Sequence, residues 1–599
     1  MSSFSVDMHD LEFVLFDQMG MDKKLGALAR YADLDREVYT AALAEAKRIG
    51  LEVLDPINAP GDREGCSLDK DGNVTTPKGY KNAWTTLAEG SWVAVSAPAE
   101  LGGGGMPFLM AMAVNEILCG ACMAFMMYPG LTAGAARVIH AHAPEALREP
   151  FARNMFSGKW GGTMCLTESG AGSSVGDNRC KAIPTDEQGV YLLEGEKIFI
   201  SGGDQDFTEN IVHLVLARTP SAGKGTKGLS LFMVPKFHVN PDGSLGERNG
   251  AHVLGIEHKM GIHGNATCTL GLGSRGPCSG WLVGQENQGI ELMFLMMNEA
   301  RIGVAVQSQA VACAAYGHAR AYARERVQGQ ALKDMKNPDA GPVAIVQHPD
   351  VRRMLMLQKV YTETMRSLLF KLALNFDVLH ETTDADERER LKNRVELFTP
   401  IVKATCSDLA YEVATLAVQT FGGYGYIGEY PVEQYVRDVK ITSIYEGTNG
   451  IQAMDLVGRK LRIGGGALFI QWMNDANGEL ERAAAAGFQS AAEALGKAIQ
   501  HLAGSAMHLA GLGKARHIEG AMLQATPFTR MFGLVLLGLE ALEQAVVAKQ
   551  LQAARGDSPL LAGKLRNLEF YVAAVLPQTI ALGKTIQSND ESCLDPALF

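Results

Sequence analysis

The stretch GVYLLEGEKIFISGG, residues 189–203, decides the fold class because it interrupts a chain whose other long segments follow helical periodicity. It is rich in β-branched, aromatic and other apolar residues, and two glycines end it, as in a strand. Three further short runs share this character: NIVHLVLART (210–219), GLSLFMVPKF (228–237) and TCTLGLG (267–273). We therefore predict an antiparallel sheet or barrel between about 161 and 285.

Helical patterns flank this β-rich region on both sides. Apolar residues recur at helical spacing in residues 36–54 and 79–90 before it, and in 299–327 and 393–423 after it. Three glycines at 464–466 then mark a hinge, and Ala- and Leu-rich helices follow. The predicted fold class is α+β multidomain, with an N-terminal helical domain (1–160), a central antiparallel β domain (161–285), a C-terminal helical bundle (286–465) and an appended C-terminal helical domain (466–599).

The composition is that of a globular protein, with 47% hydrophobic and 20% charged residues among 599. A formal charge of -11 argues against a nucleic-acid-binding surface, because phosphate binding needs clustered Lys and Arg. The N-terminal residues lack the basic start of a signal peptide and the Arg/Ser bias of a transit peptide. We expect a cytoplasmic protein that binds no nucleic acid.

Two apolar segments raise the question of a membrane. Residues 117–136 are uncharged for about the length of a bilayer span, but Pro129 and Gly130 interrupt them, which predicts a buried helix followed by a break. The second segment, MFGLVLLGLEALEQAVV (531–547), could dock on a membrane or pack against the core or a partner subunit. Because it lacks Lys/Arg flanks, burial is favoured, and no integral membrane span is predicted.

Three motifs have simple structural explanations. GLGSRG (271–276) fits a dinucleotide fingerprint literally, but neither a helix nor a βαβ unit surrounds it, which indicates a turn. Cys119 and Cys122 form a CxxC without other ligand residues nearby, which favours packing over a metal or redox role. The three histidines of residues 252–263 match no common metal-site spacing, and no metal site is predicted: they are His252, His258 and His263.

Two motifs in the β-rich region could contact a cofactor. In MCLTESGAGSSVGDNR (164–179), small residues could form an anion- or ring-edge-binding nest, with the hydroxyls of Thr167 and Ser173 as added donors. A tight turn between strands has the same composition. In KIFISGG (197–203), Phe199 and Ser201 are two residues apart, so one strand face offers an aromatic wall and a hydroxyl, although a core-facing strand end looks the same.

A third candidate lies at the end of a helical segment, in YARERVQG (322–329). Arg324 and Arg326 stand there as ordinary partners of a helix dipole, or as guanidinium groups that grip a pyrophosphate.

The most specific stretch runs from 418 to 460. Its glycines, among them Gly422 and Gly423, allow something flat or phosphorylated to approach the backbone closely. Thr448 is the expected N-cap of a helix that begins at NGIQ. Just before it, Glu446 stands on a loop among Ile, Tyr and Ile side chains, and an apolar setting raises the pKa of a carboxylate towards that of a useful general base.

These motifs, in this order, resemble those of the acyl-CoA dehydrogenase flavoprotein family. The resemblance is clearest over about 80–465 and rests on LTESGAGSS, KIFISGG, KMGIHGNAT, EARIGVA, ARERVQG, QTFGGYGY and IYEGTNGIQ. The long N-terminal extension and the appended helices are similar to the large bacterial branch, which includes 3-methylthiopropanoyl-CoA and longer-chain acyl-CoA dehydrogenases.

The resemblance implies FAD bound between the β domain and the C-terminal helical bundle, with part of the site supplied by a neighbouring subunit. It implies Glu446 as the base that abstracts the α-proton, while hydride passes to flavin N5 and trans-2-enoyl-CoA forms. The implied cofactor residues are Leu166, Thr167, Ser173, Phe199, Ser201, Arg326, Gln419, Gly422, Gly423 and Thr448. The implied substrate residues are Ser173, Arg301 and Tyr445.

The resemblance also implies partners and leaves alternatives open. The implied partners are an acyl-CoA substrate, an electron-transferring flavoprotein as acceptor, and further copies of the chain in a homodimer or dimer of dimers. The substrate expected is 3-methylthiopropanoyl-CoA or a medium- or long-chain fatty acyl-CoA, in dimethylsulfoniopropionate catabolism or fatty acid β-oxidation. Open alternatives are an alkylation-response-type DNA-associated flavoprotein, a flavin oxidase of the same fold, and Glu299 as a rival base.

Overall fold

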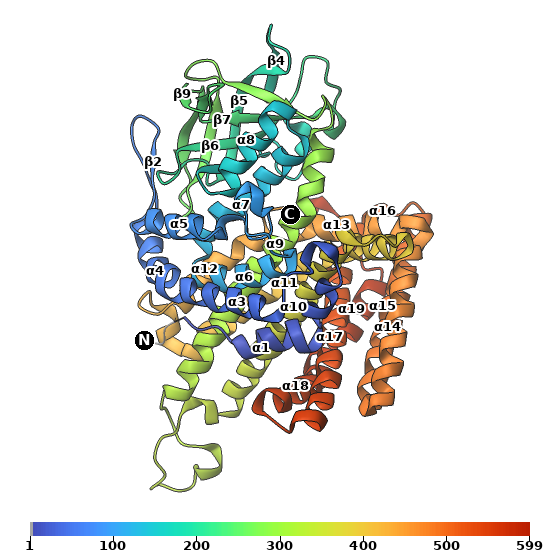
Figure 1. Ribbon diagram of the computed structural model, residues 1–599. Helices are drawn as coiled ribbons and strands as arrows, with labels where there is room; N and C mark the ends of the chain where they lie inside the picture. Colours follow the sequence, from blue (N-terminus) through green and yellow to red (C-terminus); the bar gives the residue numbers. More distant parts are fainter. Residues whose placement is uncertain (1–3) are drawn as a thin grey trace. The chain divides into compact units, whose positions relative to one another are not determined.

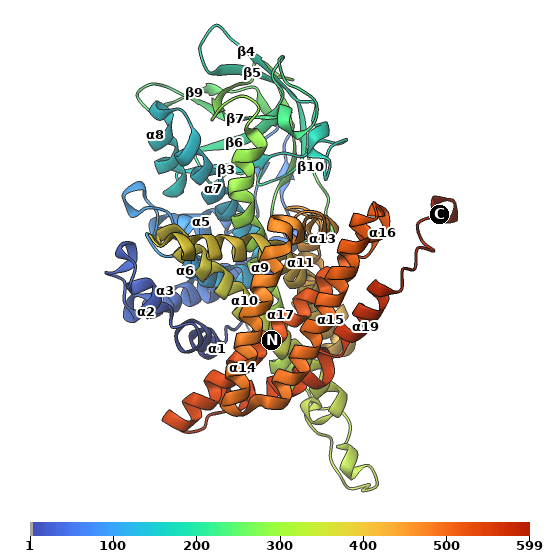
Figure 2. The ribbon, with the colours of Figure 1, turned by 90° about the vertical axis from the view of Figure 1, so that its right-hand side faces the viewer.

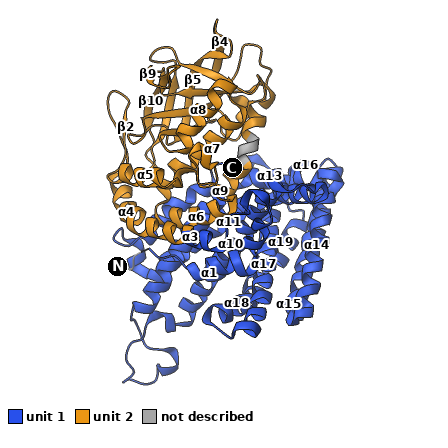
Figure 3. Cartoon of the chain, viewed as in Figure 1, with its two compact units in different colours: residues 1–41, 304–599 blue, residues 42–303 orange. Residues whose placement is uncertain are grey.

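A computed structural model describes residues 4–599, apart from the side chains of residues 294–297. The chain forms two compact units, one of residues 42–303 and one of residues 1–41 and 304–599 (Figure 3). Two helices, α3 (Arg36–Ile49) and α9 (Gly289–Glu325), cross from one unit to the other. The four domains stated above remain a prediction.

The unit of residues 42–303 contains helices followed by a sheet. Its helices are α4 (Asp55–Glu64), α5 (Tyr80–Glu89), α6 (Phe108–Ala121), α7 (Met123–His142) and α8 (Glu145–Phe156). A short hairpin joins β1 (Ser67–Leu68) and β2 (Val74–Thr75), and another joins β8 (Phe237–Val239) and β9 (Leu245–Arg248). The main sheet holds β3 (Trp160–Cys165), β4 (Lys181–Pro184), β5 (Val190–Ser201), β6 (Asn210–Ala217), β7 (Ser230–Pro235), β10 (Ala251–Ile256), β11 (Thr267–Leu272) and β12 (Ser279–Val283).

The main sheet has the strand order β10-β11-β5-β12-β7-β6-β3, with β4 also paired to β5. All neighbours are antiparallel except β3 and β6, which run parallel, so the predicted antiparallel sheet has one parallel pair. Every residue of β6 is buried because apolar clusters cover both faces. Val212 and Leu214 join the cluster that includes α7 and α8, whereas Val215 joins the opposite one. This alternation explains why β6 reads as one continuous apolar run.

The uncharged segment 117–136 is buried, as predicted, but its break lies elsewhere. The chain leaves helical geometry at Cys122, with φ -156° and ψ 88°, between α6 and α7. Pro129 lies inside α7 instead of ending it. The helical break therefore lies at Cys122 and not at Pro129, whereas the burial of the segment agrees with the prediction.

The other unit is helical in the part that the structure describes. Its first helices are α1 (Met8–Glu12) and α2 (Met21–Gly26), and its central bundle holds α10 (Pro349–Glu381), α11 (Ala385–Phe421), α12 (Val432–Val439) and α13 (Asn449–Gly458). Between α9 and α10, residues 326–348 extend away from this bundle as a loop (Figures 1 and 2). Three successive glycines with positive φ, at 464–466, then turn the chain away from α13.

The appended helices after this turn pack side by side (Figure 2). They are α14 (Ala467–Ala483), α15 (Gln489–Lys514), α16 (Ile518–Leu523), α17 (Ala525–Arg555), α18 (Pro559–Phe570) and α19 (Gln578–Gln587). Among described residues, α17 alone is long and apolar enough to cross a membrane, yet 83% of its most apolar window is buried. Its apolar surface is therefore part of the core, as the sequence favoured.

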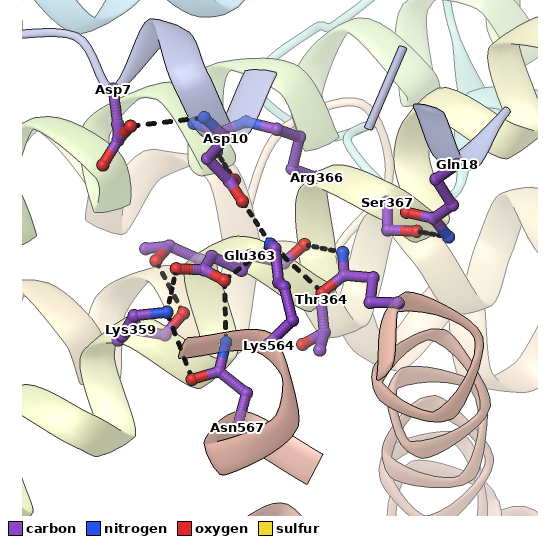
Figure 4. Close-up of polar contacts among 12 residues, drawn as sticks. Asp7, Asp10, Gln18, Lys359, Glu363, Thr364, Arg366, Ser367, Lys564 and Asn567 are labelled. Atoms are coloured by element: carbon purple, nitrogen blue, oxygen red, sulfur yellow. Dashed lines mark hydrogen bonds and ion pairs between the residues drawn. The ribbon is translucent and has the colours of Figure 1, made fainter. Parts of the chain in front are cut away.

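A buried ionic network ties the chain's beginning to its end (Figure 4). Lys564 of α18 is fully buried, and its Nζ donates to Asp10 of α1 and to Glu363 of α10, with the second bond 2.6 Å long. Arg366 also contacts Asp10, and Lys359 also contacts Glu363. Residues separated by more than 500 positions thus share one set of charges.

Candidate active site

Glu446 lies on the loop that precedes α13. Its φ is +53° and that of Gly447 is +84°, so two consecutive residues take the left-handed conformation. A non-glycine residue rarely adopts this conformation, and such strain gathers at functional sites. Thr448 is the N-cap of α13, as predicted, and its Oγ1 accepts a hydrogen bond of 3.2 Å from the N–H of Ile451.

Two buried side chains donate hydrogen bonds to carbonyl oxygens of this loop. The amide of Gln452 donates to the carbonyl oxygens of Glu446 (3.3 Å) and Gly447 (3.1 Å). The ammonium of Lys403, on α11, donates to the same Gly447 oxygen at 2.8 Å. Lys403 could not be identified from the sequence, because a lysine in a long helical pattern is usually solvated.

Tyr445 is half-buried, and its hydroxyl donates to the side-chain oxygen of Gln307 on α9. This bond ties the phenol to α9 and restricts the position of the ring. Tyr445 was predicted as a substrate residue, and that role stays a prediction.

The other α9 candidates lie in the unit of residues 42–303. Arg301 is buried, with 5% of its surface exposed. Glu299, the rival base, is ion-paired with Arg137, whose guanidinium also donates to the hydroxyl of Ser96 at 2.6 Å. The carboxylate of Glu299 is therefore engaged by a cation within its own unit.

A pocket of about 510 Å³ brings together four of the predicted cofactor residues, namely Arg326, Gln419, Gly422 and Gly423. Gly422 ends α11 with φ +62°, and a Cβ added at Gly422 or Gly423 would meet open space. The guanidinium of Arg326 lies 5.3 Å from the ring centre of Tyr424.

An aromatic wall borders the same pocket. The rings of Tyr322 and Phe421 are stacked, with centres 4.1 Å apart, and both line the cavity. The pocket therefore combines a planar cation, an amide, unhindered backbone and flat apolar surface. These groups suit a ligand that carries both phosphate and an aromatic base.

The predicted nest begins at Leu166 and Thr167 and is anchored by a buried ion pair that the sequence did not reveal. Lys197 is fully buried, and its ammonium donates to the carboxylate of Glu168 (2.8 Å) and to the carbonyl of Leu166 (3.1 Å). Burial raises the pKa of Glu168, but the charge and hydrogen bond of Lys197 and the N–H groups of Arg179 and Cys180 together outweigh it, so the pKa is lowered. The N–H of Ile198 donates to the carbonyl of Thr167 at 2.9 Å, which joins this segment to β5.

Phe199 occupies a bulge in β5. Between the pairs Cys268 with Ile200 and Leu270 with Lys197, β5 has one residue more than β11. Phe199 takes φ +57° there, and 59% of its surface is exposed. A large exposed aromatic side chain in a strained conformation is a signal of function.

The remaining predicted residues lie nearby in the sequence. Ser201 ends β5 and is half-buried, whereas Ser173 is exposed on the loop between β3 and β4. The hydroxyl of Ser173 is therefore accessible to a ligand. Neither role is established by this placement.

The structure also shows where the other motifs lie. GLGSRG forms a turn after β11, with φ +75° at Gly273 and +116° at Gly276. Cys119 and Cys122 are buried and form no disulfide, and burial raises the pKa of the Cys119 thiol. Among the described residues, no three His, Cys, Asp or Glu side chains form a group that could hold a metal ion.

Models of four protein domains match successive parts of the chain between residues 67 and 596. They are the acyl-CoA dehydrogenase N-terminal domain (67–159), middle domain (163–273) and C-terminal domain (287–461), and the acetyl-CoA dehydrogenase C-terminal-like domain (471–596). Together these matches cover most of the chain.

Full-length relatives support the same assignment. The chain is 37% identical to the 3-methylmercaptopropionyl-CoA dehydrogenase of Ruegeria pomeroyi, over 100% of both chains. It is 36% identical, again over 100% of both, to a broad-specificity linear acyl-CoA dehydrogenase of Mycobacterium tuberculosis. The crystal structure of an acyl-CoA dehydrogenase complexed with FAD from Bacillus anthracis shares the fold, with a TM-score of 0.73 over 92% of this chain and 88% of that one, at 20% identity. The chain therefore belongs to the acyl-CoA dehydrogenase family, an FAD-using family of enzymes.

Proposed function

We propose that this enzyme converts an acyl-CoA thioester to the trans-2-enoyl-CoA, with Glu446 as the base that removes the α-proton. The observation that carries this proposal is the left-handed Glu446, held on a supported loop at the start of α13. A strained, half-buried carboxylate fits a group that must be placed against one particular C–H bond.

The residues present fit FAD. The pocket around Arg326 offers a guanidinium for phosphate oxygens and stacked rings beside a nucleobase-sized space, with Gly422 and Gly423 leaving the backbone open. The exposed ring of Phe199 offers a flat surface for an isoalloxazine, and Thr167 and Ser201 offer hydroxyls at its edge.

We therefore assign two groups of cofactor residues. The flavin ring is held by Leu166, Thr167, Ser173, Phe199 and Ser201. The diphosphate and adenosine are held by Arg326, Gln419, Gly422, Gly423 and Thr448.

The chain's own part in the reaction is proton removal and charge stabilisation. The α C–H of a thioester is a poor acid, so the Glu446 carboxylate must lie close to it and accept its proton. The N–H of Glu446 donates to the thioester oxygen as negative charge develops there, and one such donor is worth about 3 kcal/mol in related sites. FAD, when bound, supplies the acceptor for the β-hydride. Tyr445 lies beside the thioester, and Arg301 contacts the CoA portion.

We propose an unbranched acyl group as the substrate, either 3-methylthiopropanoyl or a linear fatty acyl chain. The support is chemical: the relatives reported above are named for a 3-methylmercaptopropionyl and for linear acyl thioesters, and all these acyl groups are unbranched.

The test is an anaerobic dye-reduction assay over acyl-CoAs of increasing chain length, including 3-methylthiopropanoyl-CoA. Glu446→Gln removes the base and should lower kcat by about 100- to 10,000-fold, the range for a general base. Glu299→Gln is the matched control, because it makes the same change at the rival carboxylate, which is engaged by Arg137. Full activity in Glu446→Gln would overturn the proposed mechanism.

The remaining assignments complete the proposal. We propose a cytoplasmic homodimer or dimer of dimers that passes its electrons to an electron-transferring flavoprotein. Size-exclusion chromatography with light scattering tests the assembly, and reduction of a purified electron-transferring flavoprotein tests the acceptor. The four-domain division given from the sequence is kept as part of this proposal.

A further inference from the structure

We infer that Lys403 is a positioning residue for Glu446, holding the strained loop in the conformation that the reaction needs. This inference rests on the proposed function of Glu446. It concerns a residue that does not carry the reacting group and acts through the backbone of its neighbour.

The first argument is the bond between Lys403 and the loop. Lys403 is fully buried on α11, and its ammonium donates to the carbonyl oxygen of Gly447 at 2.8 Å. A hydrogen bond from a charged donor is roughly twice as strong as a neutral one. The Gly447 carbonyl belongs to the peptide unit between Gly447 and Thr448, so fixing it restricts the path of the chain directly after Glu446, whose own carbonyl is held by Gln452.

Second, the bond from Lys403 opposes backbone strain at Glu446. Glu446 has φ +53°, which costs a non-glycine residue about 1–2 kcal/mol. Without an external restraint, the loop would relax towards a right-handed or extended conformation, and the carboxylate would move with it. Lys403 from α11 and Gln452 from α13 supply the restraint from two different helices.

The third argument is that Lys403 also fixes the first residue of α13. Its ammonium donates to the side-chain oxygen of Asn449 at 3.0 Å, and the hydroxyl of Ser407 donates to the same oxygen at 3.1 Å. The Asn449 amide in turn donates to Asp408 at 2.7 Å. The loop and the start of α13 are therefore joined to α11 as one body.

The placement of the charge favours a role in the site over a role in helix stability. The ammonium lies at the N-terminal end of α13, where the helix dipole is positive and disfavours a cation. Burying an ammonium carries a further cost. A buried ammonium at a helix N-terminus lowers local stability, and such an arrangement is expected where function requires it.

The test compares Lys403→Met with the wild-type holoenzyme. Methionine keeps the length and apolar stem of the side chain but removes the donor. We expect kcat to fall by about 100-fold, since a misplacement of about 1 Å can have that effect. KM and the Kd for a trans-2-enoyl-CoA product should stay within about 3-fold, and the visible flavin spectrum and FAD content should not change. The rate of α-proton exchange with deuterated solvent, followed by NMR on the bound thioester, should fall in parallel with kcat.

A control and a second variant make the result decisive. Lys371→Met is the control. Lys371 lies on α10 and pairs with Glu540 and Glu543 of α17, so its loss should leave kcat unchanged. Gln452→Met removes the second donor to the Gly447 carbonyl and should also lower kcat, so the inference is tested even if Lys403→Met does not fold. In the double variant the two losses should be less than multiplicative, because both act through one carbonyl.

Three outcomes separate the possibilities. Loss of kcat and of proton exchange with normal FAD content supports the inference. Unchanged kcat in Lys403→Met, or in Gln452→Met if only that variant folds, overturns it while a dead Glu446→Gln keeps the proposed function intact. An active Glu446→Gln overturns the proposed function itself, whatever the lysine variant does.

Discussion

Replacing Lys564 by methionine should destabilise the unit that joins the chain's two ends. The change leaves Asp10 and Glu363 buried without their shared ammonium. Removing one partner of a buried ion pair costs about 3–5 kcal/mol. Because Asp10 keeps Arg366 and Glu363 keeps Lys359, we expect the lower end, about 3 kcal/mol.

Thermal unfolding followed by circular dichroism measures this loss. With an unfolding entropy of about 2 cal/mol/K per residue, a unit of about 340 residues should lose about 4 °C in Tm. Arg566→Met on the same helix is the matched control, because its ion pair with Glu569 is exposed, and it should change Tm by less than about 1 °C. Adding Asp10→Asn to Lys564→Met should cost less than the sum of the single changes. A Tm for Lys564→Met equal to that of the control would refute the reasoning.

Three further predictions follow from single positions. Phe199→Gly should relieve the left-handed strain and keep the free energy of unfolding within about 1 kcal/mol of the wild type. FAD retention on dialysis should fall. A lower Tm with unchanged FAD retention would contradict this. Arg326→Gln should raise the Kd of the apoenzyme for FAD by about 10- to 100-fold, measured by flavin fluorescence, because a charged hydrogen bond to phosphate is lost. Burial lowers the pKa of His213 to about 3, so its contribution to stability is complete above pH 6.5 and declines as the pH falls towards 3. Between pH 7 and pH 5, the free energy of unfolding of His213→Gln should therefore fall by about 2 kcal/mol less than that of the wild type, as measured by urea titration. An equal fall in both proteins would contradict this.

The sequence predicted the order of helices and strands because periodicity is a local property. It also predicted the cap of α13, since Thr448 precedes a helical run directly. The parallel pairing of β3 with β6 escaped prediction because strand partners depend on contacts between distant segments. The break at Cys122 escaped it as well, because Pro129 is the stronger local signal.

For the proposed site, the sequence suggested candidate ligand contacts, which stay predictions, but it did not reveal the residues that support the loop and strand carrying them. Phe199 was found by its spacing from Ser201, but the bulge that exposes it depends on the register with β11. Lys197 and Lys403 were missed, because a lysine in a strand or helix pattern usually points to solvent. Their partners, Glu168 and the Gly447 carbonyl, are brought to them only by the fold.

The ion pair between Asp10 and Lys564 also has a meaning for synthesis on the ribosome. The two residues are separated by 554 positions. At about 5–20 residues per second, Lys564 is added roughly 30–110 s after Asp10. During this interval Asp10 is already present on the nascent chain, but Lys564, with which it pairs when buried, has not yet been synthesised. The first helix of the protein should therefore be among the last to reach its final place, and holding chaperones should find it exposed while translation continues.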